Sequence, residues 1–367
     1  QVYKSYLIGI LLFSESIFDG VFGFKKIKEF GGVTILQNPN SEGIKNVSQN
    51  VIAIYDADFV IKSGAIPAEL LQIQEKLTMN KAYNEEENLP NQEQEILNRI
   101  IQLILLNTAN DFSNYKPATL RKRISIRMVI MQKDSLESYY SLFQNNKKEQ
   151  EILFNDLLIT TSYFFRDQHL FDNLAHTVFP SLVKNKINSA LRIWVPGCAT
   201  GEEAYSLAIC IDEYLAQNNI EDLKVQIIAS DLSEKSIAKA RAAMYSNFDV
   251  QHIAKERLQK YFVKNNGQYH VRKAIRDKCI FAVHNIVKDP PFAKIDLISC
   301  RNVLSYFNPF LQNKVLASFH YSLKENGLLL LGKSETVNNA LYLFENNEDQ
   351  QGIFLRKSVG AYFPSKI

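Results

Sequence analysis

The residues most able to do chemistry lie in the segment GCATGEEAYS, residues 197–206, which combines two glycines with two adjacent glutamates. The apolar run LRIWV precedes it, so the segment leads from a predicted buried strand into a predicted helix. Gly197 and Gly201 permit the backbone to turn and to approach a ligand closely. Glu202 and Glu203 would repel a pyrophosphate but favour a ligand that carries an ammonium or sulfonium group. The alternative is that both glutamates only stabilise the helix N-terminus through its dipole, by about 0.3–1 kcal/mol each.

The second predicted strand, VQIIAS, ends at Asp231, where a carboxylate can accept hydrogen bonds from ribose hydroxyls. The alternative role for Asp231 is to cap the following helix, but Ser233 is an equally good cap. The segment after the first strand is not G-x-G-x-x-G and has no P-loop lysine. The distance from Gly201 to Asp231 also exceeds the roughly 20 residues of the dinucleotide fingerprint.

The third and fourth predicted strands lead into the segments HNIVKDPPF and SCRNVLSYF. Asn285 can hydrogen-bond an adenine edge while Ile286 packs on the adenine face, although a lone asparagine in such a loop is usually a turn residue. Arg301, Asn302 and Tyr306 follow the fourth strand, where substrate and cofactor would meet. Polar or glycine-rich segments thus follow four successive strands, which favours a ligand site at this edge of the sheet.

The elements that position these residues are predicted from alternating buried runs and helical segments. The strands LRIWVP, VQIIAS, CIFAVHN, IDLISC and GLLLLG indicate a parallel, doubly wound α/β sheet. Two further strands, YLFENN and GIFLRKS, are joined by a polar turn and predict an antiparallel hairpin. A parallel sheet that ends in an antiparallel hairpin is typical of methyltransferases that use S-adenosylmethionine. This cofactor carries an ammonium and a sulfonium group, and both suit the adjacent glutamates.

Composition divides the chain of 367 residues into several parts. Residues 1–76 show α/β patterning, a polar stretch containing Pro90 predicts a linker, and apolar residues at helical spacing predict an all-α domain. Within the last large part, YFVKNNGQYHVRK predicts a β-hairpin around Asn-Gly. The predicted boundaries are 1–76, 77–91 (linker), 92–165 (all-α domain), 166–357 (α/β domain with a β-subdomain at about 246–279) and 358–367 (tail).

Charge and cysteine content exclude several classes of function. A formal net charge of +3 does not by itself indicate nucleic-acid binding. The apolar run over residues 6–13 is far shorter than the roughly 20 residues of a membrane span, so no membrane insertion is expected. No metal site is predicted, because the cysteines fit no zinc motif and are interpreted as reduced, buried thiols of a cytoplasmic protein. These cysteines are Cys198, Cys210, Cys279 and Cys300.

Four segments in this order, GCATGEEAYSLA, ASDLSEKSIAKAR, DLISCRNVLSYF and LKENGLLLLGKSE, strongly resemble chemotaxis receptor methyltransferases of the CheR type. These enzymes transfer a methyl group from S-adenosylmethionine to glutamate side chains and release S-adenosylhomocysteine. The resemblance covers about residues 92–357 and implies a Rossmann-like methyltransferase domain after an all-α domain. It implies cofactor-binding roles for Thr160, Ser162, Arg166, Gly197, Glu203, Asp231, Asn285, Ile286, Arg301 and Asn302.

The segment LLITTSYFFRD resembles the signature N-x-T-x-F-F-R that precedes the catalytic domain in this family. Thr160 stands where the family often has asparagine and Ser162 where it has threonine, whereas Arg166 matches. The resemblance implies catalytic roles for Arg166, which would orient the substrate carboxylate or cover the cofactor, and for Tyr306, near the transferred methyl group. Because the acceptor glutamate is already ionised at pH 7, no general base is expected.

The helical segment LRKRISIRM places Arg123 and Arg127 on one helix face, four residues apart. Without the resemblance, a solvated face is the favoured interpretation. The resemblance instead implies that this basic helix, with Arg121, docks the acidic methylation helix of a cytoplasmic receptor domain. The β-subdomain tethers a receptor tail in some family members, and the sequence leaves open whether it does so here.

The first part of the chain, from FDGVFGF to IPAELL, resembles the C-terminal part of the chemotaxis methylesterases of the CheB type. Asp19 falls at the position of that family's triad aspartate. No segment matches the triad serine and histidine, and a triad without its nucleophile cannot form an acyl-enzyme. We therefore expect no methylesterase activity, and we interpret the chain as part of a CheB/CheR fusion protein cut inside the esterase domain.

Two alternatives to the enzyme remain at the level of sequence. The changes at Thr160 and Ser162 are compatible with a signalling module that binds S-adenosylmethionine but transfers methyl groups weakly. A nicotinamide-dependent Rossmann enzyme is the other alternative, but the missing G-x-G-x-x-G and the terminal hairpin argue against it.

Overall fold

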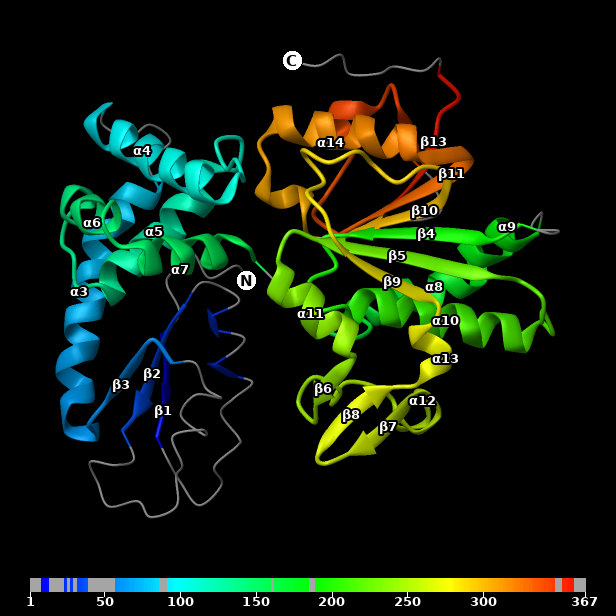
Figure 1. Ribbon diagram of the computed structural model, residues 1–367, viewed down its shortest axis with the longest axis horizontal. Coiled ribbons are helices and arrows are strands. Elements are labelled where there is room, and N and C mark those ends of the chain that lie inside the picture. Colours follow the sequence, from blue (N-terminus) through cyan, green and yellow to red (C-terminus); the bar gives the residue numbers. More distant parts are fainter. Residues whose placement is uncertain are drawn as a thin grey trace. The chain divides into compact units, whose positions relative to one another are not determined.

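The computed structural model shows two compact units, formed by Gln1–Ile159 and Thr160–Ile367 (Figure 1). Each unit is described separately below. The described residues are 8–12, 23–24, 27–28, 32–38, 57–85, 91–159, 162–184, 189–346 and 352–359. Among them, no helix combines the length and the apolar character that a membrane crossing requires.

The first unit begins with a parallel three-stranded sheet in the order β1-β2-β3. Its elements are β1 (Ile8–Leu11), β2 (Val33–Gln37), β3 (Phe59–Ile61), the short helix η2 (Ser63–Ala65) and the helix α3 (Ile66–Glu85). This arrangement agrees with the α/β patterning predicted for residues 1–76. Helix α3 continues to Glu85, so the predicted linker over 77–91 is wrong up to that residue. The reason is that Leu77 lies one helical turn after Ile73, and both side chains are buried in the same apolar cluster.

Four further helices complete the first unit and confirm the all-α prediction. They are α4 (Asn91–Thr108), α5 (Pro117–Ile130), α6 (Leu136–Phe143) and α7 (Lys147–Leu157). Their apolar residues recur at helical spacing and form one buried core, which includes Ile100, Ile104, Leu120, Ile124, Tyr139, Phe143 and Leu153. The second apolar side of α5 packs elsewhere, since Ile126 and Val129 are buried with Val33 and Ile73.

Packing on two sides of α5 changes the interpretation of its arginines. The prediction of an exposed basic face is wrong for Arg121 and Arg127, whose side chains are buried. Arg127 donates to both carboxylate oxygens of Glu149, from Nε at 2.8 Å and from Nη2 at 2.6 Å. Arg123 is half-buried, and its Nη1 donates to the carbonyl oxygen of Lys28 at 3.2 Å. Arg127 therefore contacts Glu149 inside the protein, whereas the sequence pattern predicted that it contacts solvent or a receptor.

The second unit contains a seven-stranded sheet in the order β12-β13-β11-β10-β4-β5-β9. The strands are β4 (Leu191–Pro196), β5 (Val225–Asp231), β9 (Cys279–Val283), β10 (Ile295–Cys300), β11 (Leu323–Leu331), β12 (Phe344–Asn346) and β13 (Ile353–Arg356). All neighbours pair in parallel except β13, which is antiparallel to both β11 and β12. The predicted doubly wound sheet with a terminal antiparallel hairpin is confirmed.

Helices cover both faces of this sheet (Figure 1). Helices α10 (Glu202–Gln217) and α11 (Glu234–Ala242) lie on one face, and α14 (Pro309–Ser322) lies on the other. The unit opens with α8 (Gln168–Asn173), the π-helical turn η3 (Leu174–Val178) and α9 (Phe179–Val183). Two short helices, η4 (Leu304–Tyr306) and η5 (Asn338–Ala340), follow β10 and β11.

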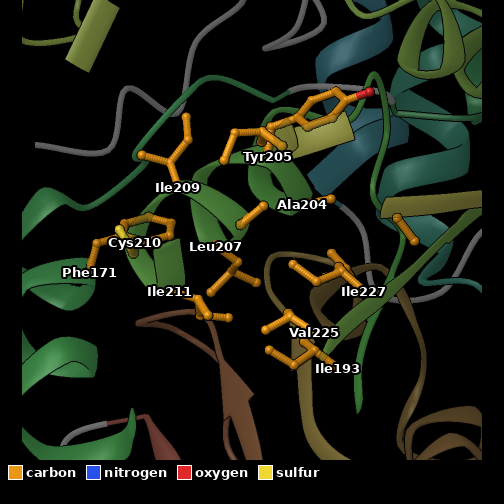
Figure 2. Close-up of a cluster of buried hydrophobic side chains, with 14 of the residues drawn as sticks. Phe171, Ile193, Ala204, Tyr205, Leu207, Ile209, Cys210, Ile211, Val225 and Ile227 are labelled. Atoms are coloured by element: carbon orange, nitrogen blue, oxygen red, sulfur yellow. The ribbon is translucent and has the colours of Figure 1, made fainter. Parts of the chain in front are cut away.

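Helix α10 is held against the sheet by side chains on its inner face. Leu207 and Ile211, one turn apart, point toward Ile193 of β4 and Val225 of β5 (Figure 2). All four are fully or almost fully buried, and burying a leucine or isoleucine side chain contributes about 1.5–3 kcal/mol. This packing fixes the start of α10, and with it Glu202 and Glu203, at the carboxyl end of the strands.

The β-subdomain is a small antiparallel sheet in the order β6-β8-β7. It comprises β6 (Met244–Ser246), α12 (Lys255–Tyr261), β7 (Phe262–Asn265), β8 (Gln268–Val271) and α13 (Lys273–Arg276). Asn266 and Gly267 form a two-residue turn with φ of 48° and 78°, as a type I′ hairpin requires. The hairpin predicted around Asn-Gly is therefore confirmed.

Candidate active site

The loop between β4 and α10 turns on residues with left-handed backbone, including Gly197 (φ 67°) and Gly201 (φ 94°). The predicted turn is thus present. The space beside each glycine, however, is filled by the protein itself. A Cβ atom on Gly197 would lie 2.4 Å from Cγ2 of Val303, and one on Gly201 would lie 2.9 Å from Cβ of Ala240. Both glycines are therefore required by the local packing, and the expected close approach to a ligand is not needed to explain them.

Glu202 stabilises this loop from inside. Its carboxylate is buried and accepts a hydrogen bond from the Thr200 hydroxyl at 2.6 Å. The Thr200 carbonyl oxygen in turn accepts from the Tyr245 hydroxyl at 2.7 Å. Of the two adjacent glutamates, Glu202 therefore serves the protein, and Glu203 is the one that faces the strand ends.

Glu203 contacts two groups at the end of β10. Its Oε1 accepts from the Ser299 hydroxyl at 2.6 Å, and its Oε2 accepts from Nη1 of Arg301 at 3.1 Å. A carboxylate offers about four acceptor positions, so each oxygen retains one. These two contacts fix the side chain in place and still leave it able to accept a hydrogen bond from a cationic ligand.

Asp231 lies at the end of β5 and links it to the loop that follows β4. Its Oδ2 accepts from the Ala199 amide and its Oδ1 accepts from the Ser233 amide, both at 2.8 Å. Burial raises the pKa of Asp231, and the hydrogen bonds from the Ser233 and Ala199 amides oppose that shift. Ser233 caps α11 by accepting from the Ser236 amide at 3.2 Å, so the helix does not need Asp231 as its cap.

After β9, Asn285 organises a turn. Its side-chain Oδ1 accepts from the backbone amides of Val287 at 2.9 Å and Lys288 at 3.3 Å. Its backbone amide donates to Oδ2 of Asp289 at 2.8 Å. The alternative interpretation, in which Asn285 is a turn residue, is therefore correct for its side-chain oxygen. Ile286 is half-buried beside it, and the contact of both residues with adenine remains a prediction.

The turn after β10 is held by a residue that sequence reasoning missed. The buried carboxylate of Glu335 accepts from the amides of Asn302 at 2.7 Å, Gly332 at 2.9 Å and Ser305 at 3.0 Å. Asn302 has left-handed backbone (φ 60°), and its buried Oδ1 has no hydrogen-bond partner within the described part of the chain. Tyr306 follows in η4 and is half-buried. An acidic residue closely following the strand GLLLLG was the signal available for Glu335.

The segment before α8 lies against the same region. The Phe165 amide donates to the Ser206 hydroxyl on α10 at 2.9 Å, and the Arg166 carbonyl oxygen accepts from Nη2 of Arg301 at 2.9 Å. Arg166 and Ser162 are half-buried. Thr160, like Asp19 in the first unit, lies outside the described residues.

Hydrogen bonds thus join most predicted site residues of the second unit. Glu203, Arg301 and the Arg166 backbone form one group, Asp231 joins the ends of β4 and β5, and Asn302 is held through Glu335. Acidic side chains dominate the atoms offered to a ligand, which favours a positively charged one. The sheet order with its antiparallel hairpin is that of a methyltransferase dependent on S-adenosylmethionine.

The chain belongs to the CheR methyltransferase family. The family model described as the CheR methyltransferase SAM-binding domain matches residues 160–353, and the model of its all-alpha domain matches residues 95–158. The cofactor of this family's SAM-binding domain is S-adenosylmethionine.

Several curated relatives are similar over most of the same region. The chain is 33% identical over 236 residues to chemotaxis protein methyltransferase 1 of Pseudomonas aeruginosa, covering 62% of this chain and 86% of the relative. It is 29% identical over 261 residues to chemotaxis protein methyltransferase 2 of Vibrio cholerae, covering 70% and 88%. It is also 38% identical over 245 residues to an uncharacterized 104.1 kDa protein of Rhodobacter capsulatus, covering 66% of this chain but only 26% of that longer protein.

The residues present fit S-adenosylmethionine. Asp231 retains acceptor positions for ribose hydroxyls after its two backbone hydrogen bonds. Glu203 and the unpartnered Oδ1 of Asn302 are acceptors suited to the ammonium group of the methionine part. The binding of the cofactor by these three side chains, like the contact of Asn285 and Ile286 with adenine, remains a prediction.

Proposed function

We propose that this protein transfers the methyl group of S-adenosylmethionine to glutamate side chains of a chemoreceptor-like signalling protein. The observation that carries the proposal is the pair of acidic residues Glu203 and Asp231 in a CheR-type domain. Glu203 is held at the end of β10, and Asp231 lies at the end of β5. The relatives named chemotaxis protein methyltransferase support the choice of substrate. The proposed substrate, the cytoplasmic part of a receptor, places the reaction in the cytoplasm.

The chemistry demands alignment more than proton transfer. The cofactor supplies a methyl group activated by the sulfonium, and the acceptor carboxylate is ionised at neutral pH, with an ordinary pKa of about 4.3. Arg166 would orient that carboxylate, and Tyr306 would line its approach. His284 is engaged elsewhere, since its Nε2 lies 3.1 Å from the Pro290 carbonyl oxygen. Proximity and orientation can contribute up to about 7–11 kcal/mol to such a reaction.

Substrate docking needs a revised assignment. Because Arg121 and Arg127 are buried, we retain only Arg123, which is half-buried, from the predicted basic face of α5. Acidic receptor helices remain the partner that the family relationship favours.

For the first part of the chain we propose an origin in a methylesterase of the CheB type. The parallel strands β1, β2 and β3 lie outside the residues matched by the CheR models. A longer relative, the 104.1 kDa protein, matches this chain over 245 residues, which make up only 26% of its own length. We propose no esterase activity for this segment.

A transfer assay tests the proposed function. Purified protein, radiolabelled S-adenosylmethionine and receptor cytoplasmic fragments should yield labelled fragment, and alkali should release the label as methanol because it is held as a carboxyl ester. Calorimetry with S-adenosylhomocysteine provides the control for cofactor binding. Cofactor binding without any transfer to several receptors would instead support the weakened signalling module, and binding of NAD alone would refute both.

Substitution of Tyr306 by phenylalanine should lower turnover about tenfold, because the hydroxyl no longer positions the acceptor carboxylate. The affinity for S-adenosylhomocysteine should change by less than about twofold, since one hydroxyl contributes little when a cofactor has many other contacts. Steady-state kinetics and calorimetry measure the two quantities. Unchanged turnover would remove Tyr306 from the mechanism.

A further inference from the structure

The segment Phe165–Asp167 has an unusual backbone beside a predicted active-site residue. Phe165 (φ 52°) and Asp167 (φ 62°) are both left-handed although neither is glycine, and Arg166 lies between them. Such conformations are strained for residues other than glycine and persist only where the surroundings hold them. On one side, the hydrogen bond from the Phe165 amide to the Ser206 hydroxyl on α10 stabilises this backbone.

Arg301 stabilises the same backbone from the other side. Its Nη2 donates to the carbonyl oxygen of Arg166 at 2.9 Å and to Oδ2 of Asp167 at 2.5 Å. Its Nη1 donates to Oε2 of Glu203 at 3.1 Å. The Arg301 side chain is 1% exposed, whereas those of Asp167 and Glu203 are 26% and 13% exposed, so the arginine side of both ion pairs is shielded from water.

Two carboxylates, from Asp167 and Glu203, face Arg301. Asp167 also lies near Lys333, whose Nζ is 3.4 Å from its Oδ1. Lys333 is 76% exposed and therefore screened. The buried pair, and not the exposed lysine, determines the position of Asp167.

We propose that Asp167 and Arg301 form a positioning pair that sets both the Arg166 segment and Glu203 for cofactor binding. Asp167 is then a positioning residue that acts through Arg301, and Arg301 acts on the Arg166 segment and on Glu203 through its hydrogen bonds to them. This inference rests on the proposed function, which assigns Arg166 and Glu203 to the site. An arginine suits this position because its planar guanidinium holds Nη1 and Nη2 in a fixed geometry, with Nη1 donating to Glu203 and Nη2 to Arg166 and Asp167.

The experiment measures the affinity for S-adenosylhomocysteine by calorimetry in Asp167→Asn, Arg301→Lys and the double variant. Asp167→Asn should bind about tenfold more weakly, because the hydrogen bond from the buried arginine loses its charged acceptor. Arg301→Lys should lose at least as much. The double variant should bind within about twofold of Arg301→Lys, since the two residues act as one unit.

The control is Asp277→Asn, which breaks an exposed pair with Lys273 on α13 and should leave affinity unchanged. Asp167→Glu should restore most of the loss, and the fluorescence transition of Trp194 in urea should stay at the wild-type midpoint. Wild-type affinity in Asp167→Asn, additive losses in the double variant, or a loss that only follows a lowered midpoint would each overturn the proposal. If Asp167→Asn does not fold, Arg301→Lys alone decides, and wild-type affinity there overturns it.

These measurements require no receptor. A wild-type protein that binds S-adenosylhomocysteine but methylates no receptor would refute the proposed function. The dependence of cofactor affinity on the Asp167–Arg301 pair would still be decided by the calorimetry.

Discussion

Asp231→Asn should reduce the affinity for S-adenosylhomocysteine by about a hundredfold or more. The substitution replaces one carboxylate oxygen by an amide donor, which must then face either the Ala199 amide or the Ser233 amide. It also removes the charged acceptor for two ribose hydroxyls, and hydrogen bonds to a charged group contribute roughly 1.5–3 kcal/mol each. Two of them correspond to at least about a hundredfold in affinity, at about 1.4 kcal/mol per tenfold.

Calorimetry measures this loss, and pH dependence provides a second measurement. Burial raises the pKa of Asp231 above its ordinary value of 3.8, so the carboxyl group becomes protonated at a higher pH than an exposed aspartate. The affinity of the wild-type protein should therefore fall as the pH is lowered from 7 toward that raised pKa, while that of Asp231→Asn should stay nearly flat.

The same shift has a consequence for stability. Because the folded protein binds this proton more tightly than the unfolded chain, the contribution of Asp231 to stability is fully present below pH 3.8 and is lost as the pH rises through the raised value. Asp277→Asn, on a carboxylate that forms an exposed pair with Lys273, is a matched control for the affinity measurements. Near-normal cofactor affinity in Asp231→Asn would show that the ribose is held elsewhere.

Glu149→Ala should lower the free energy of unfolding of the first unit by about 3–5 kcal/mol, because it leaves Arg127 buried with its main partner removed. The Glu149 side chain is 2% exposed, and that of Arg127 is 9% exposed. Glu149 also accepts from the hydroxyl of Tyr139 at 2.9 Å. Burial and the neighbouring Glu149 raise the pKa of Tyr139, so the phenol stays neutral and donates. Asp156, 3.7 Å from Arg127, compensates only in part.

Urea denaturation followed by circular dichroism measures this effect. The fluorescence of Trp194, the protein's single tryptophan, reports on the second unit separately. Glu95→Ala is the control, because Glu95 and Arg99 form an exposed pair one helical turn apart, worth about 0.2–1 kcal/mol. A Glu149→Ala protein as stable as this control would mean that Arg127 reaches water after all.

The strands and helices of the second unit were predictable because burial leaves a periodic mark on the sequence. LRIWVP and IDLISC are mostly apolar because both faces of β4 and β10 are covered by helices. The hairpin at Asn266 and Gly267 was predictable because these residue types favour the left-handed backbone that a type I′ turn needs. The apolar face of α5 that packs against the other helices was also predicted correctly. A single periodic pattern, however, cannot show that a second face of the same helix is buried as well.

The site was predictable only in part. The residue types that follow each strand, above all Asp231, pointed to the carboxyl ends of β4, β5, β9 and β10. The roles of Glu335 and Asp167 were missed, because each is a single acidic residue whose partners are distant in sequence. Gly197 and Gly201 were linked to a ligand, whereas the structure fills the space beside them with Val303 and Ala240.

The order of strands and helices, the turn chemistry and the acidic character of the strand ends can be read from the sequence, since each depends on residues within a few positions of one another. Which charged groups meet depends on the packing of the folded chain. Arg301 joins Asp167 across 134 residues, and Arg127 joins Glu149 across 22. Residues so far apart in sequence come within about 4 Å of each other only when the chain packs, and local sequence patterns do not record that packing.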